Sequence, residues 1–384
     1  MEEQRSLPLL ARFPESKLDA LLISHAPNVR YLTGYTGSNG LLLLDAGGRG
    51  ILFTDPRYAI QAAREATCKA QRVRRAPPDK PGTGSRRTPF CAYSLEVKVV
   101  RGPLLGAAAK VIGAKRLRRI GFEMAHLSWA DHALLSKELP LKTALEPVSG
   151  WVEQQRMIKS AVEIEAIRRS VLLNSQAFAN TVKKVRPGLR ESEVAAELEY
   201  QMRRLGAEKP AFETIVASGE RTALPHARPT ANQLASNELL LIDMGASVEG
   251  YCSDMTRMAF LGRPGSKIKS MYGAVLEAQL AAIDAVRENV TAERVDRAAR
   301  QVLKRHGFDK AFVHSAGHGL GLEIHEPPRL GKRDKTPIKA GMVVTIEPGI
   351  YLEGVGGIRI EDTLLVTRTG CEVLTPTSKD LLSL

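Results

Sequence analysis

The stretch LLLIDMGASVEGYCSDMTRMAFLG, residues 239–262, places two carboxylates in apolar surroundings. Short β-prone runs lie on either side of a turn at 245–250, which predicts a hairpin. A turn centred on residues 248–249 sets Asp243 opposite Asp254, with Cβ atoms about 4.5–5.5 Å apart. Buried carboxylates this close repel each other unless a cation joins them. The stretch therefore indicates either a metal site or a half-buried hairpin that carries two unrelated acids.

A second segment, HSAGHGLGLEIHEPP at 314–328, holds three of the chain's eight histidines, His314, His318 and His325. Glycines lie on both sides of His318, and glycine lets the backbone approach a ligand closely. An isolated histidine is more often structural than functional. The clustering here favours a functional role for His318, either as a ligand or beside one.

Two further acids lie in a second predicted hairpin. GMVVTIEPGIYL, residues 341–352, contains Glu347 in an apolar strand, and a glycine-rich turn leads to IRIEDTLLV at 358–366, which contains Glu361. Arg359 precedes Glu361 by two residues, so both lie on one face of that strand, where Arg359 can pair with a ligand carboxylate. The pattern of strand, glycine turn and strand, with one carboxylate on each strand, therefore occurs twice.

The four acids and the glycine-flanked histidine form one candidate ligand set: Asp243, Asp254, His318, Glu347 and Glu361. This set is rich in oxygen and free of sulfur, which favours Mn²⁺, with Co²⁺ or Zn²⁺ as alternatives. Four carboxylates around one divalent ion leave a net negative site, so we expect two ions. Paired ions about 3.5–4 Å apart suit hydrolysis, and an amide is the first candidate substrate.

The chain has 384 residues, 43% of them hydrophobic, which favours two domains over one. It contains no run of about 18 apolar residues and no signal-peptide pattern, so we expect a soluble cytoplasmic protein without a membrane partner. The four cysteines are widely separated and form no CxxC pair, which argues against a zinc finger or a disulfide framework.

The net charge of +13 is concentrated in one segment. Residues 66–120 contain 14 Lys and Arg but only two acids, a net charge of +12. Aromatic residues, which would stack on bases, are sparse there, so a solvated basic lobe is preferred and we do not expect a nucleic-acid partner. Within this segment, the Arg/Pro-rich residues 74–89 have the composition of an exposed loop.

Alternating elements indicate an α/β first domain over residues 1–150 and a second domain over 151–384. In the first domain we predict strands at 18–25, 40–46, 51–58 and 119–123, helices at 59–66, 102–117 and 129–139, and a loop or short helix at 28–40. In the second domain we predict two helices before the first hairpin and two after it, at 157–188, 189–206, 266–286 and 292–307.

Together these motifs resemble the pita-bread metallopeptidases, in particular Xaa-Pro aminopeptidase and prolidase. The matching segments are NVRYLTGYTGS, LLLIDMGASVEGYCSDMTR, HSAGHGLGLEIHEPPRL, GMVVTIEPGIYL and GGIRIEDT. The resemblance implies an α/β creatinase-like N-terminal domain followed by an α+β pita-bread catalytic domain. It also implies that one metal is held by Asp243, Asp254 and Glu361, and the other by Asp254, His318, Glu347 and Glu361.

The resemblance also implies roles for residues around the metals. Glu347 is expected to shuttle protons during attack on the carbonyl before proline. His226, in ALPHARPT, is expected to contact the substrate and to steady the tetrahedral intermediate, and His325 is expected near the developing oxyanion. His314 is expected to line the pocket for the proline ring, and Arg359 to orient a ligand carboxylate. Family members are commonly homodimers, so we expect a homodimer that takes proline-containing peptides.

Several alternatives remain open at this point. We favour an Xaa-Pro aminopeptidase, but an Xaa-Pro dipeptidase (prolidase) shares all these ligands. Methionine aminopeptidase does not need a creatinase-like first domain, and creatinase works without metal, so residues 1–150 and the intact ligands argue against these two. A metal-free pita-bread protein that grips an acidic partner through residues 66–120 is the alternative from a different functional class.

Overall fold

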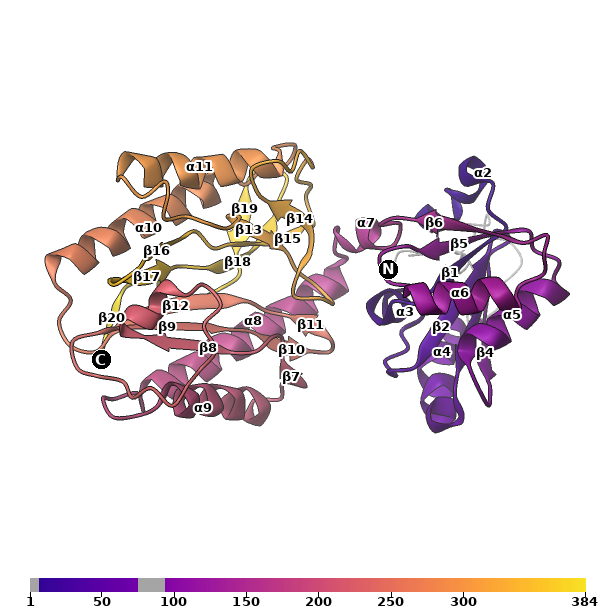
Figure 1. Cartoon of the computed structure of the whole chain (residues 1–384), viewed down its shortest axis with the longest axis horizontal. Coiled ribbons are helices and arrows are strands. Elements are labelled where there is room, and N and C mark those ends of the chain that lie inside the picture. The colour runs from indigo at the N-terminus through magenta and orange to yellow at the C-terminus, as the bar shows by residue number, and fades with distance from the viewer. Residues whose placement is uncertain (1–6, 75–93) are drawn as a thin grey trace, which may run out of the picture. The chain divides into compact units, whose positions relative to one another are not determined.

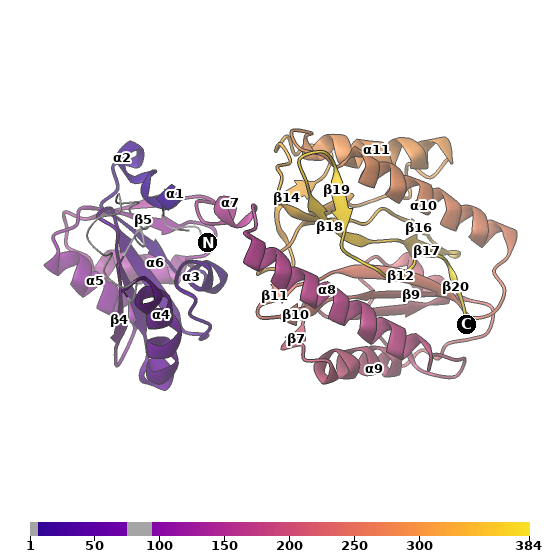
Figure 2. The ribbon, with the colours of Figure 1, turned by 180° about the vertical axis from the view of Figure 1, so that it is seen from behind.

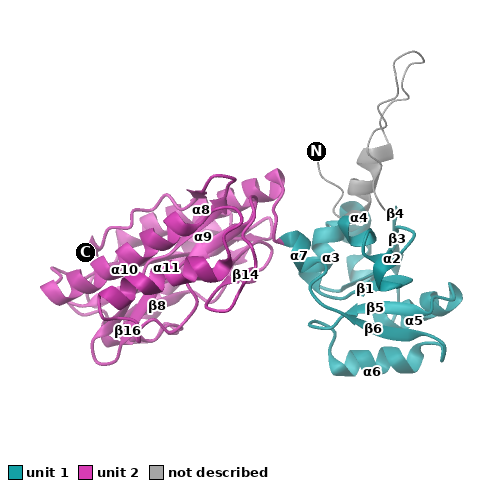
Figure 3. Cartoon of the chain, turned by 90° about the horizontal axis from the view of Figure 1, so that it is seen from above, with its two compact units in different colours: residues 1–156 teal, residues 157–384 magenta. Residues whose placement is uncertain are grey.

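A computed structural model describes residues 7–74 and 94–384. The chain divides into two compact units, Met1–Arg156 and Met157–Leu384 (Figure 3). The domain boundary predicted between residues 150 and 151 stays a prediction. Most of the Arg/Pro-rich loop predicted at 74–89 lies outside the described residues.

The first unit is built on a six-stranded mixed sheet in the order β4-β3-β2-β1-β5-β6. Its strands are β1 (Ala20–Ile23), β2 (Gly40–Asp45), β3 (Arg49–Thr54), β4 (Ser94–Val99), β5 (Arg119–Glu123) and β6 (Ala144–Val148). Strands β1, β2 and β3 pair antiparallel, whereas β4, β5 and β6 join in parallel. The sheet confirms the four predicted strands of this unit, except that residues 56–58 of the strand predicted at 51–58 form a 3₁₀ turn. It also contains β4 and β6, which were not predicted.

Helices complete the first unit. They are α1 (Leu7–Leu10), α2 (Phe13–Ser16), α3 (Ala26–Thr33), α4 (Ala59–Arg74), α5 (Leu104–Ala114), α6 (Trp129–Glu138) and α7 (Glu153–Arg156), with a 3₁₀ turn, η1, at Pro56–Tyr58. Helix α3 fills the start of the segment predicted as a loop or short helix, and Gly34, at φ 78°, ends it. The predicted helices at 59–66, 102–117 and 129–139 are confirmed as α4, α5 and α6.

The second unit contains four long helices and a set of short strands. The helices are α8 (Ala161–Val182), α9 (Glu191–Arg204), α10 (Ser266–Ala285) and α11 (Ala292–Arg305), and η2 (Gly219–Ala223) is a 3₁₀ turn. The strands are β7 (Lys209–Pro210), β8 (Ile215–Ser218), β9 (Leu239–Met244), β10 (Ala246–Val248), β11 (Tyr251–Cys252), β12 (Met255–Phe260), β13 (Gly317–Gly319), β14 (Glu326–Leu330), β15 (Val343–Ile346), β16 (Gly349–Leu352), β17 (Gly356–Arg359), β18 (Asp362–Val366), β19 (Cys371–Val373) and β20 (Leu382–Ser383). All four predicted helices are confirmed.

The larger sheets of this unit have the strand orders β20-β12-β9-β8 and β14-β13-β15-β18-β19. Figures 1 and 2 show α8 and α9 on one side of the strands and α10 and α11 on the other. Alternate side chains of β9 pack on opposite faces of the sheet. Leu240 and Ile242 pack with α8 and α9. Leu239 and Leu241 pack with α10 and α11. Because side chains alternate along a strand, Asp243 points to the same side as Leu241, into the interior of the unit.

The first predicted hairpin exists, but its register differs from the prediction. Strands β9 and β12 pair so that Asp243 lies opposite Thr256, and the predicted opposition of Asp243 to Asp254 is wrong. The turn is centred one residue later than predicted, because Glu249 (φ 50°) and Gly250 (φ 77°) take the left-handed conformations at its tip. The error is two residues, so it preserves the face, and Asp254 stays on the side of Asp243. Within the described residues no helix is both long and apolar enough to span a membrane.

Candidate active site

Three of the candidate acids lie where the strands are interrupted. Asp254 falls between β11 and β12, Glu347 between β15 and β16, and Glu361 between β17 and β18. The prediction that Glu347 and Glu361 each lie within one strand is therefore wrong, because each predicted strand is divided into two at the acid. Strand β15 pairs with β18 and β16 pairs with β17, so Glu347 and Glu361 lie where two neighbouring strands change partners together. A residue at such a break does not follow the alternation of side chains between the two faces of a sheet. The carboxylates of these residues point toward a shared centre.

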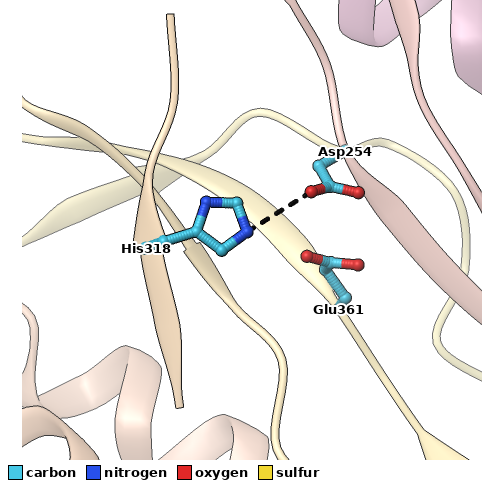
Figure 4. A group of neighbouring side chains, drawn as sticks. All are labelled: Asp254, His318 and Glu361. Atoms are coloured by element: carbon cyan, nitrogen blue, oxygen red, sulfur yellow. Dashed lines mark ion pairs between the residues drawn. The ribbon is translucent and has the colours of Figure 1, made fainter. Parts of the chain in front are cut away.

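The shared centre brings together residues from distant parts of the chain. Asp254, His318 and Glu361 each offer one ligand atom, and these atoms lie within 4.8 Å of one another (Figure 4). Nε2 of His318 is 3.5 Å from Oδ2 of Asp254 and 3.6 Å from Oε1 of Glu347. Nδ1 of His318 donates to the carbonyl oxygen of Gly319 at 3.0 Å, so Nε2 is the ring nitrogen that faces the acids.

The fifth candidate ligand, Asp243, is held by Arg359. Nη2 of Arg359 donates to Oδ2 of Asp243 at 2.6 Å, and Nε donates to Oγ1 of Thr256 at 3.1 Å. The Thr256 hydroxyl in turn donates to Oε2 of Glu361 at 2.7 Å. Arg359 and Thr256 therefore orient two of the acids while leaving their remaining oxygen atoms available.

The electrostatics of this cluster call for cations. Burial, and then the charges of Asp243 and Glu347, raise the pKa of Asp254 well above its ordinary value. Burial, and then the charge of Asp254, raise the pKa of Glu361 in the same way. Oδ1 of Asp243 and Oδ1 of Asp254 are buried and have no hydrogen-bond partner in the described part of the chain. Such oxygens are costly unless something positive binds them, so the residues present fit divalent metal ions.

All site residues predicted from the sequence line one cavity of about 880 Å³. These residues are His226, Asp243, Asp254, His314, His318, His325, Glu347, Arg359 and Glu361. The rings of His318 and His325 meet edge to face with centroids 4.4 Å apart. His226 and His325 are both exposed and line the cavity wall. The cavity thus gathers histidines and acids from five separate segments of the second unit.

Two family models match the chain. That of metallopeptidase family M24 matches residues 165–368, and that of the Creatinase/Prolidase N-terminal domain matches residues 5–158. The chain belongs to metallopeptidase family M24. The predicted creatinase-like domain followed by a pita-bread catalytic domain is therefore confirmed, as is the prediction of a metallopeptidase.

Relatives of this M24 metallopeptidase include the Xaa-Pro dipeptidase of Pyrococcus horikoshii, which is 35% identical over 368 residues, 96% of this chain and 95% of the relative. The solved structure of an Xaa-Pro dipeptidase from Bacillus anthracis is 34% identical, with a TM-score of 0.88 over 99% of both chains. An X-Pro aminopeptidase from Thermotoga maritima MSB8 is also 34% identical, with a TM-score of 0.83 over 96% of this chain and 98% of that one.

The M24 site also contains a residue that the sequence analysis missed. The hydroxyl of Tyr351 accepts from Nη1 of Arg359 at 2.6 Å and lies 2.9 Å from Nε2 of His314. Because Nδ1 of His314 donates to the carbonyl of Ser315, its Nε2 accepts the Tyr351 proton. The register of β16 and β17 makes Tyr351 and Arg359 diagonal neighbours. This proximity follows from the strand pairing, so the sequence alone does not indicate it.

The hydrogen bonds that connect Arg359, Tyr351 and His314 join groups whose protonation states do not change near neutral pH. Burial raises the pKa of Tyr351 to about 12, so the phenol keeps its proton at neutral pH. Burial, and then the charge of Arg359, lower the pKa of His314 to about 4, so the imidazole is neutral. Each hydrogen bond from Arg359 through Tyr351 to His314 therefore has one direction near pH 7.

Proposed function

We propose that this protein is an Xaa-Pro dipeptidase, a prolidase. The observation that carries the proposal is the gathering of four acids and His318 in one cavity, in a chain whose named relatives include Xaa-Pro dipeptidases along its whole length. The aminopeptidase expected from the sequence is less well supported by these relatives than its alternative, the dipeptidase. The match to the Thermotoga maritima X-Pro aminopeptidase keeps the aminopeptidase as the second candidate.

The proposed metal ligands are Asp243, Asp254 and Glu361 for one ion and Asp254, His318, Glu347 and Glu361 for the other. When bound, two divalent cations would polarise the scissile carbonyl and lower the pKa of the attacking water. We propose Mn²⁺ as the metal, because the donors are mostly carboxylate oxygens and none is sulfur. Elemental analysis of the purified protein tests both the number and the identity of the ions.

The chain's own residues would carry the remaining steps. Glu347, whose Oε1 lies 3.6 Å from His318, is proposed to take the proton from water and deliver it to the proline nitrogen. His226 and His325, on the cavity wall, are proposed to donate to the oxygen of the tetrahedral intermediate. Arg359 is proposed to keep Asp243 in the orientation that its 2.6 Å hydrogen bond gives.

The cavity wall also supports a dipeptide substrate. His314 lines the cavity and is proposed to contact the proline ring. The guanidinium-bearing side chain of Arg329 lines the same cavity. In an Xaa-Pro dipeptide the free carboxylate follows proline directly, so a guanidinium on this wall favours a dipeptide over a longer peptide.

The test is a comparison of Leu-Pro with Leu-Pro-Gly as substrates of the purified protein in Mn²⁺, Co²⁺ or Zn²⁺. We expect cleavage of the dipeptide and little cleavage of the tripeptide. Arg329→Met should raise KM for the dipeptide about tenfold or more, since it removes a charge-assisted contact, and should change tripeptide kinetics little. Efficient cleavage of the tripeptide would instead support the aminopeptidase.

Two other expectations from the family resemblance also belong to this proposal. A homodimer is expected, and light scattering after size-exclusion chromatography tests it. A cytoplasmic location is expected, and cell fractionation tests that.

A further inference from the structure

The loop that carries His226 connects Ser218, the last residue of β8, with Thr230. His226 lies near its middle and reaches the cavity wall. In the described part of the chain, no hydrogen bond holds the imidazole of His226, so the ring is placed by the backbone of residues 219–229. The contacts that hold the backbone of this loop therefore determine the position of the His226 ring.

Both ends of the loop are anchored by one buried carboxylate, Glu191, at the start of α9. Oε1 of Glu191 accepts from the backbone N–H of Ser218 at 2.8 Å and from its hydroxyl at 3.1 Å. Oε2 accepts from the backbone N–H of Thr230 at 3.1 Å and from its hydroxyl at 2.8 Å. One oxygen therefore serves the entry of the loop and the other serves its exit.

Arg221 braces the loop from within. Its Nε lies 3.1 Å from Oε1 and 3.2 Å from Oε2 of Glu191, and its Nη2 donates to the carbonyl of Arg228 at 2.8 Å. Glu191 is fully buried, which by itself raises its pKa, but the hydrogen bonds from Thr230 and Ser218 and the charge of Arg221 outweigh burial and lower the pKa. The carboxylate thus stays ionised at neutral pH, when both oxygens can only accept.

The tip of the loop is connected to the cluster of acids through Arg359. The carbonyl of Pro225, next to His226, accepts from Nη1 of Arg359 at 3.2 Å, and Arg359 binds Asp243 through Nη2. The loop around His226 is thus held at its two ends by Glu191 and at its tip by Arg359, and the hydroxyl of Thr222 also accepts from the N–H of Gly357 on β17 at 2.8 Å. Glu191 does not line the cavity, and of these anchors it alone binds both ends of the loop.

We propose that Glu191 is a positioning residue for His226, which it keeps at the distance from the metal cluster that catalysis requires. This inference rests on the proposed function, because His226 has a role only if the cavity hydrolyses a peptide. Misplacement of a catalytic group by about 1 Å can cost about a hundredfold in rate, so an anchor at the base of this loop is expected to affect turnover.

The main test is Glu191→Gln, assayed on Leu-Pro. Whichever way the amide lies, its NH₂ group faces donors at one end of the loop, so that end loses its acceptor. We expect kcat to fall about tenfold to a hundredfold, with bound metal unchanged. The matched control is Glu193→Gln on the same helix turn, because Glu193 caps α9 through the N–H of Arg190 at 2.7 Å and does not contact the loop. The control should keep wild-type kcat.

A double-mutant cycle separates positioning from general damage. In the His226→Ala background, Glu191→Gln should change kcat by less than about twofold, since the residue through which it acts is gone. An undiminished effect in that background, or wild-type kcat in Glu191→Gln alone, overturns the proposal. Should Glu191→Gln not fold, Thr230→Val removes one donor at nearly constant volume and should show the same dependence on His226.

A measurement without substrate separates this inference from the proposed function. Backbone amides of residues 219–229 should exchange hydrogen faster in Glu191→Gln than in wild type or Glu193→Gln. If wild-type protein cleaves neither peptide, the proposed function fails while exchange still tests the anchor. Unchanged exchange in the loop overturns the anchoring by Glu191 whatever the activity.

Discussion

Single residues carry most of the argument for a metal site. Asp254 is 5% exposed and Glu361 2% exposed, and both are surrounded by other carboxylates. In water the repulsion between such carboxylates is weak, but in a buried cluster it is strong and has to be offset by positive charge. The buried and unpartnered Oδ1 atoms of Asp243 and Asp254 mark where a cation would bind.

Asp254→Ala tests the proposed bridging role. Asp254 is proposed to contact both ions, so its loss should reduce hydrolysis of Leu-Pro below detection and lower the amount of bound metal, while circular dichroism shows the fold retained. The control is Asp309→Ala, which removes an exposed acid outside the cavity and should leave turnover unchanged. Near-normal hydrolysis by Asp254→Ala with metal added would contradict the two-ion assignment.

Tyr351→Phe tests the donor chain behind the cluster. The substitution removes only the hydroxyl that joins Arg359 to His314. Groups that orient metal-site residues from behind typically contribute about 10–100-fold, so kcat/KM on Leu-Pro should fall by that factor. Steady-state kinetics at matched metal loading measures the effect, and unchanged kcat/KM would mean that Arg359 needs no such support.

At the level of elements, the strands of the second unit are interrupted at the acids and tied together behind them. Arg257, on β12, is 1% exposed and donates to Oδ1 of Asp362 at 2.7 Å and to the carbonyl of Glu361 at 2.5 Å. It also donates to the carbonyls of Thr377 and Ser378. One side chain thus joins β12, β18 and the segment before β20, on the far side of Glu361 from the cavity.

Arg257→Met should destabilise the second unit strongly. The substitution breaks a buried ion pair and leaves Asp362 with Lys379, at 2.8 Å, as its remaining cation, so we expect a loss of about 3 kcal/mol, the lower end of the range for breaking such a pair. Urea unfolding followed by fluorescence measures this. The comparison is Arg168→Met, because Arg168 forms a two-bond pair with Glu372 at the surface and such pairs contribute about 0–1 kcal/mol. Equal losses in the two variants would show that the buried network adds nothing.

At the scale of the whole molecule, each unit has its own core and contains a carboxyl group whose pKa is lower in the folded protein than its ordinary value. In the first unit, burial alone raises the pKa of Asp45, but the N–H of Arg49 and the ammonium of Lys115 outweigh it and lower the pKa. In the second unit, Glu191 also has a lowered pKa. For a carboxyl whose pKa is lower in the fold than in the unfolded chain, the stabilisation is present above the unfolded pKa and is lost as pH falls through the folded pKa.

The stabilisation that Asp45 and Glu191 each contribute should therefore be lost as the pH falls below about 4, the ordinary carboxyl pKa. Unfolding midpoints between pH 7 and pH 3 measure this loss. Asp45→Asn and Glu191→Gln should each be less stable than wild type at pH 7, and the difference should shrink as pH falls, because the wild-type carboxyl is then protonated too. A difference that is constant across this range would show that ionisation of these carboxylates does not stabilise the fold.

Much of this protein could be predicted from its sequence. The amphipathic periods of α8 to α11 predicted four helices, because one face of each must be buried whatever packs against it. Acids inside apolar stretches of the sequence identified the cavity residues, because a buried charge with no partner is too costly to be common. These are local signals, and they need no knowledge of which strands are neighbours.

Tertiary packing supplied the rest. The pairing of Asp243 with Thr256 depends on the conformation of Glu249 and Gly250, and one residue of difference in a turn shifts the register by two. Tyr351 and Glu191 look like an ordinary aromatic residue and an ordinary helix-start acid until distant segments, at Arg359 and at Ser218 and Thr230, donate to them. Hydrogen bonds between residues far apart in the chain leave no local pattern in the sequence. The residue types that form them also occur at ordinary surface positions, so neither partner indicates the other.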